Sequence, residues 1–191
     1  STIRVLDYAR SKKVPVVYAG SSSAHGDLYA NPYTFSKWNG EELCKLYENV
    51  YNLPIAICRF YNVYGDGQLS EGAYCTVLGI FERQFKAGEP LTITSDGEQR
   101  RDFTHVDDIV DGLYKCIGKH LNADVFELGR GKNFSINEVA DMMGGEKKYG
   151  NKVAEPFQTL ADNSKAMLML DWDPKGDLPS WIKKYKKEIG I

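Results

Sequence analysis

The sequence lacks the features of a membrane protein, a secreted protein and a zinc protein. No apolar run approaches the roughly 18 residues that a membrane span needs, and no signal peptide opens the chain. The four cysteines, Cys44, Cys58, Cys75 and Cys116, form no CxxC pair and have no second ligand at zinc spacing. We therefore expect reduced thiols, no metal site, no membrane association and a cytoplasmic location.

Long basic runs are also missing. The formal net charge of the 191 residues is −2. The one basic cluster, Lys183 to Lys187, falls in a terminal helical pattern, where a solvated face explains it. We therefore expect no nucleic-acid binding. Hydrophobic residues make up 42% of the chain, which is ordinary for a globular protein of this length.

The apolar pattern of the first third predicts an α/β fold. Apolar residues recur at helical spacing over 2–12 and 33–51. Between and after these segments, Val14–Ala19 and Ile55–Phe60 are continuous apolar runs, typical of strands buried on both faces of a parallel sheet. The alternation implies right-handed crossovers. We predict a partial doubly wound, Rossmann-like parallel sheet in which these two strands run parallel.

After Gly65 the alternation is lost. The patterns predict helices over 76–87, 106–120, 135–143, 163–170 and 179–189, and short strands over 91–94, 102–105 and 125–128. Ser135 and Glu138 have the spacing of a capping box. We expect residues 1–65, with contributions from 106–149, to form the Rossmann-like part. Residues 66–105 and 150–191 should form a small substrate-binding lobe and the C-terminal helices, with 150–178 as the later part of the lobe itself.

Tyr33 and Lys37 carry the strongest chemical signal. They lie four residues apart at the start of a predicted helix, so their side chains share one face. An ammonium group near a phenol favours the phenolate, which can take a proton from a substrate hydroxyl. A YxxxK match by itself is weak, because an aromatic residue and a lysine on one helix face often have no catalytic role.

Three further blocks surround this pair. The strand Val16–Ala19 runs into the serine-rich turn 20–23, at the carboxyl end of a parallel strand, where open α/β sheets place ligands. A serine hydroxyl there can bond the substrate oxygen that the tyrosine deprotonates; a plain turn is the alternative. Downstream lie the block 59–65, again a strand entering a loop, and the block 97–109, which contains Arg101-Asp-Phe.

These blocks, in this order, resemble the extended short-chain dehydrogenases that act on nucleotide sugars, such as UDP-galactose 4-epimerase and the NDP-sugar dehydratases. The resemblance covers nearly the whole chain, including Ala161-Asp-Asn-Ser-Lys165 and Leu170-Asp-Trp-Asp-Pro174. It implies NAD as cofactor and a nucleoside-diphosphate sugar as substrate.

The resemblance also implies roles for single residues. Ser23 matches the catalytic serine or threonine and Tyr33 the catalytic base. Lys37 matches the lysine that also holds the nicotinamide ribose. Cofactor contacts are thus expected at Tyr33, Lys37 and Phe60. Substrate contacts are expected at Asn62 and Arg101, which match the residues that hold the diphosphate; the planar fork of arginine suits phosphate.

Three departures from the family pattern bear on the reaction. The link between Ser23 and Tyr33 is short, so part of the sugar-pocket wall should be missing. Ala24-His25 stands where dehydratases carry an Asp-Glu pair, which favours an epimerase; His25 is either a substitute acid or a loop histidine without function. Gln158 stands where an arginine often helps to hold the diphosphate. We expect an NDP-hexose 4-epimerase, with a 4,6-dehydratase or another family reaction as the alternative.

The glycine motif that binds NAD in this family, GxxGxxG after the first strand, is not in the sequence. Gly129-Arg-Gly131 and Gly144-Gly145 have the positions of turns. Aligned by its motifs, the chain starts at the helix before the serine-bearing strand, so on the order of 100 residues of βα units should be missing. We expect a fragment that holds NAD poorly alone, or else a non-catalytic remnant that binds nucleotide sugars.

The missing units would leave one edge of the strand Val14–Ala19 unpaired. We therefore expect the chain not to be a monomer, but to form homo-oligomers or to associate with its missing N-terminal half.

Overall fold

The computed structural model describes residues 1–72, 75–119, 121–153 and 155–190. The chain forms two compact units. Unit 1 comprises Ser1–Tyr61, Ile109–Gly129 and Ala161–Asp173, and unit 2 comprises Asn62–Asp108, Arg130–Leu160 and Pro174–Ile191. Compared with the predicted division, 130–149 falls in unit 2 and 161–173 in unit 1.

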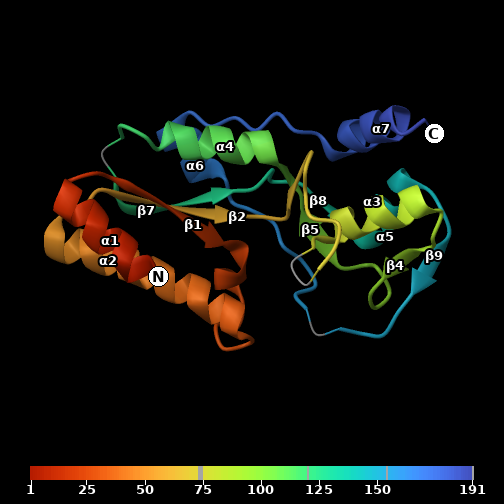
Figure 1. The fold of residues 1–191 in the computed structure, drawn as a ribbon, viewed down its shortest axis with the longest axis horizontal. Coiled ribbons are helices and arrows are strands. Elements are labelled where there is room, and N and C mark those ends of the chain that lie inside the picture. Colours follow the sequence, from red (N-terminus) through yellow and green to blue (C-terminus); the bar gives the residue numbers. More distant parts are fainter. Residues whose placement is uncertain (73–74, 120, 154, 191) are drawn as a thin grey trace. The chain divides into compact units, whose positions relative to one another are not determined.

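The sheet of unit 1 has three parallel strands in the order β1-β2-β7 (Figure 1). These strands are β1 (Val16–Ser21), β2 (Ile55–Phe60) and β7 (Asn122–Leu128). In the β1–β2 register, Val17 pairs with Ala56 and Ala19 with Cys58. The predicted fold class, with these two strands parallel in one sheet, is confirmed.

Helices cover both faces of this sheet. Figure 1 shows α1 (Thr2–Lys12) and α2 (Pro32–Tyr51) on one side of the strands and α4 (Val106–Lys115) and α6 (Ser164–Leu170) on the other. On the first side, Leu6 of α1 and Tyr47 of α2 pack with Ile57 of β2 in one buried cluster. On the other side, the Sγ atom of Cys116, just after α4, lies 3.7 Å from that of Cys58.

Among the described residues, unit 2 contains three two-stranded sheets. Strand β3 (Val63–Tyr64) runs parallel to β6 (Thr104–His105), and β4 (Leu91–Ile93) runs parallel to β9 (Lys147–Tyr149). Strand β5 (Arg100–Asp102) is antiparallel to β8 (Asn133–Ser135). Strands β3, β8 and β9 were not predicted, because two or three residues are too few to show a period.

Three helices enclose the core of unit 2: α3 (Val77–Ala87), α5 (Ile136–Met143) and α7 (Leu178–Glu188). Phe81, Ile93 and Val139 are among the fully buried residues of this core. The predicted capping box is present, because Ser135 Oγ accepts from the Glu138 N–H and the Glu138 carboxylate accepts from the Ser135 N–H.

One helix is shorter than predicted. The prediction placed a helix over 106–120, but α4 ends at Lys115. A turn follows, and Gly118 has a φ of 78°, which glycine adopts readily and which a helix does not allow. The last predicted residue, His120, lies outside the described residues.

Candidate active site

Ser23 lies in a short 3-10 turn, η1 (Ser22–His25), at the carboxyl end of β1. Ser21 caps this turn, because its Oγ accepts from the Ser23 N–H at 3.2 Å and from the Ser23 hydroxyl at 3.0 Å. The serine-rich sequence thus forms a turn held by its own hydroxyl groups. It also contacts α2.

Tyr33 and Lys37 project from the first two turns of α2. Asn31 caps this helix by accepting from the Thr34 N–H, and Pro32 begins it. The Lys37 ammonium lies 5.9 Å from the centroid of the Tyr33 ring and donates to the Ala19 carbonyl at 2.9 Å. The lysine therefore links the start of α2 to the carboxyl half of β1. The Tyr33 ring is half exposed, so its phenol is open to a ligand.

A second tyrosine, Tyr18 of β1, lies beside the same lysine. Its ring centroid is 6.0 Å from the Lys37 ammonium, and its hydroxyl donates to the Lys37 carbonyl at 3.2 Å. Burial, with Cys44 and Glu41 nearby, raises the pKa of Tyr18 to about 12. Tyr18 therefore stays protonated and supports α2, which leaves Tyr33 as the accessible phenol.

Phe60, the third residue of the predicted cofactor contact, ends β2. It is half-buried, and its register partner on β1 is Ser21. The structure thus brings Phe60 to the same sheet end as the turn of Ser23, as strand order and parallel register require.

A polar network at these strand ends was not predicted. The buried Glu41 accepts from the Arg59 guanidinium, from Nη2 at 2.7 Å and from Nε at 3.1 Å. His25 Nε2 lies 3.4 Å from the Arg59 guanidinium and 2.6 Å from Glu127 Oε1. The Tyr61 hydroxyl donates to Glu127 Oε2 at 2.7 Å. His25 thus ties the turn of Ser23 to β7.

One sequence signal could have revealed part of this network. Tyr33, Lys37 and Glu41 are spaced four residues apart, so they share one face of α2. Glu41 lies one turn beyond Lys37, on the side of α2 that packs on the sheet. Because a buried carboxylate needs an opposite charge nearby, a cation from the sheet is expected beside it. Arg59 at the end of the predicted strand supplies it.

In unit 2, Arg101 of β5 is buried and ion-paired with Glu155. Its other terminal nitrogen donates to the Arg100 carbonyl at 2.8 Å. Asn62 donates from Nδ2 to the Asp102 carbonyl at 3.3 Å. The carboxylate that balances the charge of Arg101 in this structure is therefore that of Glu155.

Asp102 has a structural task. Its buried carboxylate accepts from the N–H groups of Arg130 and Gly131 at 2.8 and 2.9 Å. Gly131 has a φ of 73°. This turn role for the Gly129-Arg-Gly131 segment agrees with the prediction.

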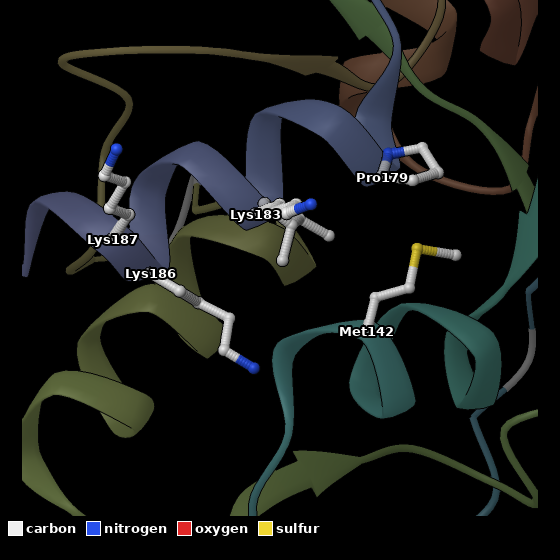
Figure 2. Close-up of a pocket in the computed structure, with 6 residues that line it drawn as sticks. Met142, Pro179, Lys183, Lys186 and Lys187 are labelled. Carbon is white, nitrogen blue, oxygen red and sulfur yellow. The ribbon is translucent and has the colours of Figure 1, made fainter. Parts of the chain in front are cut away.

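An open groove of about 480 Å³ lies in unit 2. It lies between α5 and α7, and Met142 extends from α5 toward Pro179 at the start of α7 (Figure 2). Its other lining residues are Ile182, Lys183, Lys186 and Lys187. No predicted site residue lines it, and its lysines belong to the cluster predicted to be a solvated face.

Within the described residues, no three His, Cys, Asp or Glu side chains lie close enough together to hold a metal ion. Among the same residues, no helix combines the length and apolar character that crossing a membrane requires.

Parallel strands ending in a serine turn, with a tyrosine–lysine helix beside it, define a Rossmann-like α/β protein; in open sheets of this class, ligands commonly bind at the carboxyl ends of the strands. Residues 1–129 match the model of the NAD dependent epimerase/dehydratase family. The chain belongs to this family.

Among curated relatives, an uncharacterized UDP-glucose epimerase, YtcB, of Bacillus subtilis is 33% identical over 92% of this chain and 60% of its own. A UDP-glucuronate 4-epimerase of Thermodesulfobacterium geofontis is 32% identical over 88% of this chain and 54% of its own. The chain thus spans little more than half the length of these relatives.

Among solved structures, the UDP-glucuronic acid 4-epimerase of Bacillus cereus, in complex with UDP-glucuronic acid and NAD, has a TM-score of 0.87 and 28% identity. The match covers 98% of this chain and 65% of that one. About a third of the length of that relative therefore has no counterpart here.

Proposed function

We propose that this chain is the Ser/Tyr/Lys-bearing part of an NAD-dependent NDP-hexose 4-epimerase. One observation carries the proposal: Lys37 is fixed to the Ala19 carbonyl and lies beside the half-exposed ring of Tyr33, at the sheet end where the turn of Ser23 is held. A tyrosine–lysine pair at the carboxyl end of a parallel strand suits proton transfer with a ligand bound there.

Each residue then has a definite task. Tyr33, as phenolate, takes the proton of the sugar hydroxyl, and the Ser23 hydroxyl donates a hydrogen bond to the same oxygen. The Lys37 ammonium stabilises the negative charge on Tyr33. Because epimerisation requires reduction of the same carbon from its other face, Tyr33 must return the proton to that oxygen. Bound NAD supplies the acceptor and donor of the hydride.

The residues present fit only one end of NAD. Tyr33, Lys37 and Phe60 lie at one end of the sheet, where a nicotinamide and its ribose would find an ammonium, a phenol and an aromatic ring. A pyrophosphate needs several backbone N–H groups at a glycine-rich strand–helix turn. The sequence has no such motif, and the turn after β1 is occupied by the serines. We infer that the cofactor's phosphates are held by another segment.

The epimerase assignment is favoured over a 4,6-dehydratase by the turn after Ser23. Elimination of water needs an acid and a base near the leaving hydroxyl. The turn offers Ala24 and His25 there, and His25 is already engaged by Glu127 and Arg59.

The relatives are named as UDP-sugar epimerases, so a UDP-sugar is the proposed ligand of this chain. Asn62 and Arg101 are proposed to hold its diphosphate. Arg101 is buried but keeps the bidentate guanidinium that suits this task. Its pairing with Glu155 means that a diphosphate must displace this carboxylate.

The test supplies a segment that can bind the cofactor's phosphates. The chain is co-expressed with the part of the B. cereus enzyme that has no counterpart here, and conversion of UDP-glucose and UDP-glucuronate is followed with NAD present. Tyr33→Phe should lower the rate roughly 100- to 10,000-fold. Tyr18→Phe is the matched control and should leave the rate within about threefold.

An unchanged rate in Tyr33→Phe would refute the role of this residue. Release of a 4-keto-6-deoxy sugar would favour the dehydratase. The alternative of another class, a non-catalytic remnant that binds nucleotide sugars, predicts binding of UDP by this chain in calorimetry and no conversion in any combination.

A further inference from the structure

The groove between α5 and α7 of unit 2 combines an apolar lining with a basic rim. Met142 of α5 and Pro179 and Ile182 of α7 supply the apolar lining. Ile182 is only 1% exposed, and Met142 and Pro179 are half-buried. These apolar groups therefore lie recessed in the groove and do not protrude from the surface. A methionine suits such a lining, because its flexible and polarizable side chain adapts to different apolar partners.

The rim of the groove consists of the three lysines of α7 that line it, Lys183, Lys186 and Lys187. Figure 2 shows Lys186 extending from α7 toward the end of α5, and the Lys183 ammonium on the side of Pro179. Residues three apart on a helix have their Cβ atoms about 5–6 Å from each other. Lys183 and Lys186 therefore place two positive charges about one helical turn apart along the groove.

The acidic residues close to the rim in sequence are already engaged by other lysines. Asp141 of α5 binds Lys147 at 2.7 Å, and Glu188 of α7 binds Lys184 at 3.5 Å. Within the described part of the chain, the three rim lysines form no ion pair. The rim thus carries positive charge that no carboxylate of the described residues balances.

Lys186 is held in place at one end of the groove. Its ammonium lies 5.5 Å from the centroid of the Phe85 ring of α3. A Cβ added to Gly144, which follows α5, would come within 3.2 Å of the same ammonium. Because the C-terminus of a helix carries partial negative charge, a cation is favoured there. A carboxylate that binds Lys186 would therefore not have to order this side chain first.

We propose that this groove binds an acidic peptide segment of another protein in an extended conformation. In an extended chain, residues i and i+2 point the same way and lie about 6.6–6.8 Å apart. Two carboxylates at this spacing match the ammonium groups of Lys183 and Lys186. The side chain between them points the opposite way, toward Met142, and should be apolar. The predicted recognition pattern is thus a carboxylate, an apolar residue and a second carboxylate.

Other anionic partners match the groove less well. A helix that binds a membrane surface buries an apolar face among the lipids, whereas the apolar groups here are recessed. Single-stranded nucleic acid stacks its bases on aromatic rings, and the six residues that line the groove include no aromatic side chain. A small-molecule pocket encloses most of its ligand, whereas this groove is open.

Binding is measured by fluorescence anisotropy with a short, dye-labelled synthetic peptide of alternating glutamate and leucine. We expect the affinity to fall as the salt concentration rises from about 10 to about 150 mM, because the Debye length shrinks from about 30 to about 8 Å. The same peptide with glutamine in place of glutamate should bind roughly 2- to 25-fold more weakly, since one exposed ion pair is worth roughly 1.4- to 5-fold in affinity.

Paired variants separate the groove from the net charge of the chain. Lys183→Gln combined with Lys186→Gln should weaken binding of the glutamate peptide roughly 2- to 25-fold. Lys184→Gln combined with Lys12→Gln is the matched control, because it changes the net charge equally. Lys184 does not line the groove and Lys12 lies on α1 of unit 1, so this control should bind as the original chain does. Circular dichroism confirms that both variants are folded.

The methyl group of Met142 reports directly whether the groove is occupied. Its NMR resonance, assigned with Met142→Leu, should shift when the glutamate peptide is added. Met167 of α6 is the internal control, because it is 48% exposed and belongs to unit 1. Its methyl resonance should stay in place.

Equal binding by the two lysine variants would overturn the proposal, since net charge alone would then explain the affinity. An unmoved Met142 resonance would do the same, as would a glutamine peptide that binds as tightly, or no binding at about 1 mM peptide. Binding to vesicles of anionic phospholipid, lost in Lys183→Gln with Lys186→Gln and without peptide binding, would assign the groove to a lipid surface instead.

The groove is independent of the proposed epimerase function. No residue of the candidate active site lines it. Failure of peptide binding therefore counts against the groove alone, and failure of sugar conversion counts against the proposed function alone.

Discussion

The buried ion pair between Glu41 and Arg59 allows a sharp test of how unit 1 is held together. Glu41 has no exposed surface, and the Arg59 side chain is 16% exposed. The substitution Glu41→Ala removes the carboxylate and leaves the guanidinium between α2 and β2 without its counter-ion. The Arg59 head group then keeps His25 beside it and the more distant charge of the Glu127 carboxylate.

The expected cost follows from this geometry. Breaking a buried pair by removing one partner costs about 3–5 kcal/mol, because a charge is left buried and uncompensated. For a chain of this size the cost corresponds to roughly 6–20 °C in Tm. The double variant Glu41→Leu with Arg59→Met removes both charges and should recover most of the loss, because apolar replacement of a whole pair is often nearly neutral.

Hydrogen exchange of the β2 amides under native conditions measures the stability of unit 1 alone. We expect the free energy of opening to fall by about 3–5 kcal/mol in Glu41→Ala and by less than about 1.5 kcal/mol in the double variant. A loss below about 1 kcal/mol in Glu41→Ala would refute the reasoning. So would a double variant as unstable as the sum of both single ones, since the two charges would then not be coupled.

Three further predictions address other parts of the chain. Asp177 caps α7, and the hydrogen bond from Ser180 holds its pKa below the usual value. Asp177→Ala should therefore cost about 1 kcal/mol near pH 7 in a urea titration. The difference should begin to shrink below about pH 4 and fall further as the pH drops through the lower pKa of the folded state. An undiminished difference at low pH would contradict this. Glu155→Gln should strengthen UDP binding roughly tenfold in calorimetry, because it frees Arg101 and removes a like charge; weaker binding would contradict the proposed diphosphate contact. A Cβ at Gly40 would lie 1.9 Å from the Tyr18 hydroxyl, so Gly40→Ala should lower Tm by several degrees, whereas an unchanged Tm would show that the tyrosine moves aside freely.

Much of unit 1 followed from local sequence. Continuous apolar runs identified β1 and β2, because strands of a parallel sheet are covered on both faces. The helix over 33–51 followed from its apolar spacing; in the structure α2 begins one residue earlier, at Pro32, and Asn31 caps it. Tyr33 and Lys37 were found because they lie four residues apart on one helix face, whereas the role expected of Ser23 came from the family resemblance.

The sequence by itself therefore determined the strand and helix order of unit 1, the serine turn and the tyrosine–lysine face, since each rests on neighbours along the chain. Only the tertiary structure decided that His25 contacts Glu127 and that Glu155 forms an ion pair with Arg101. Such pairings join residues 102 and 54 positions apart, and many carboxylates compete for each cation until the backbone is placed.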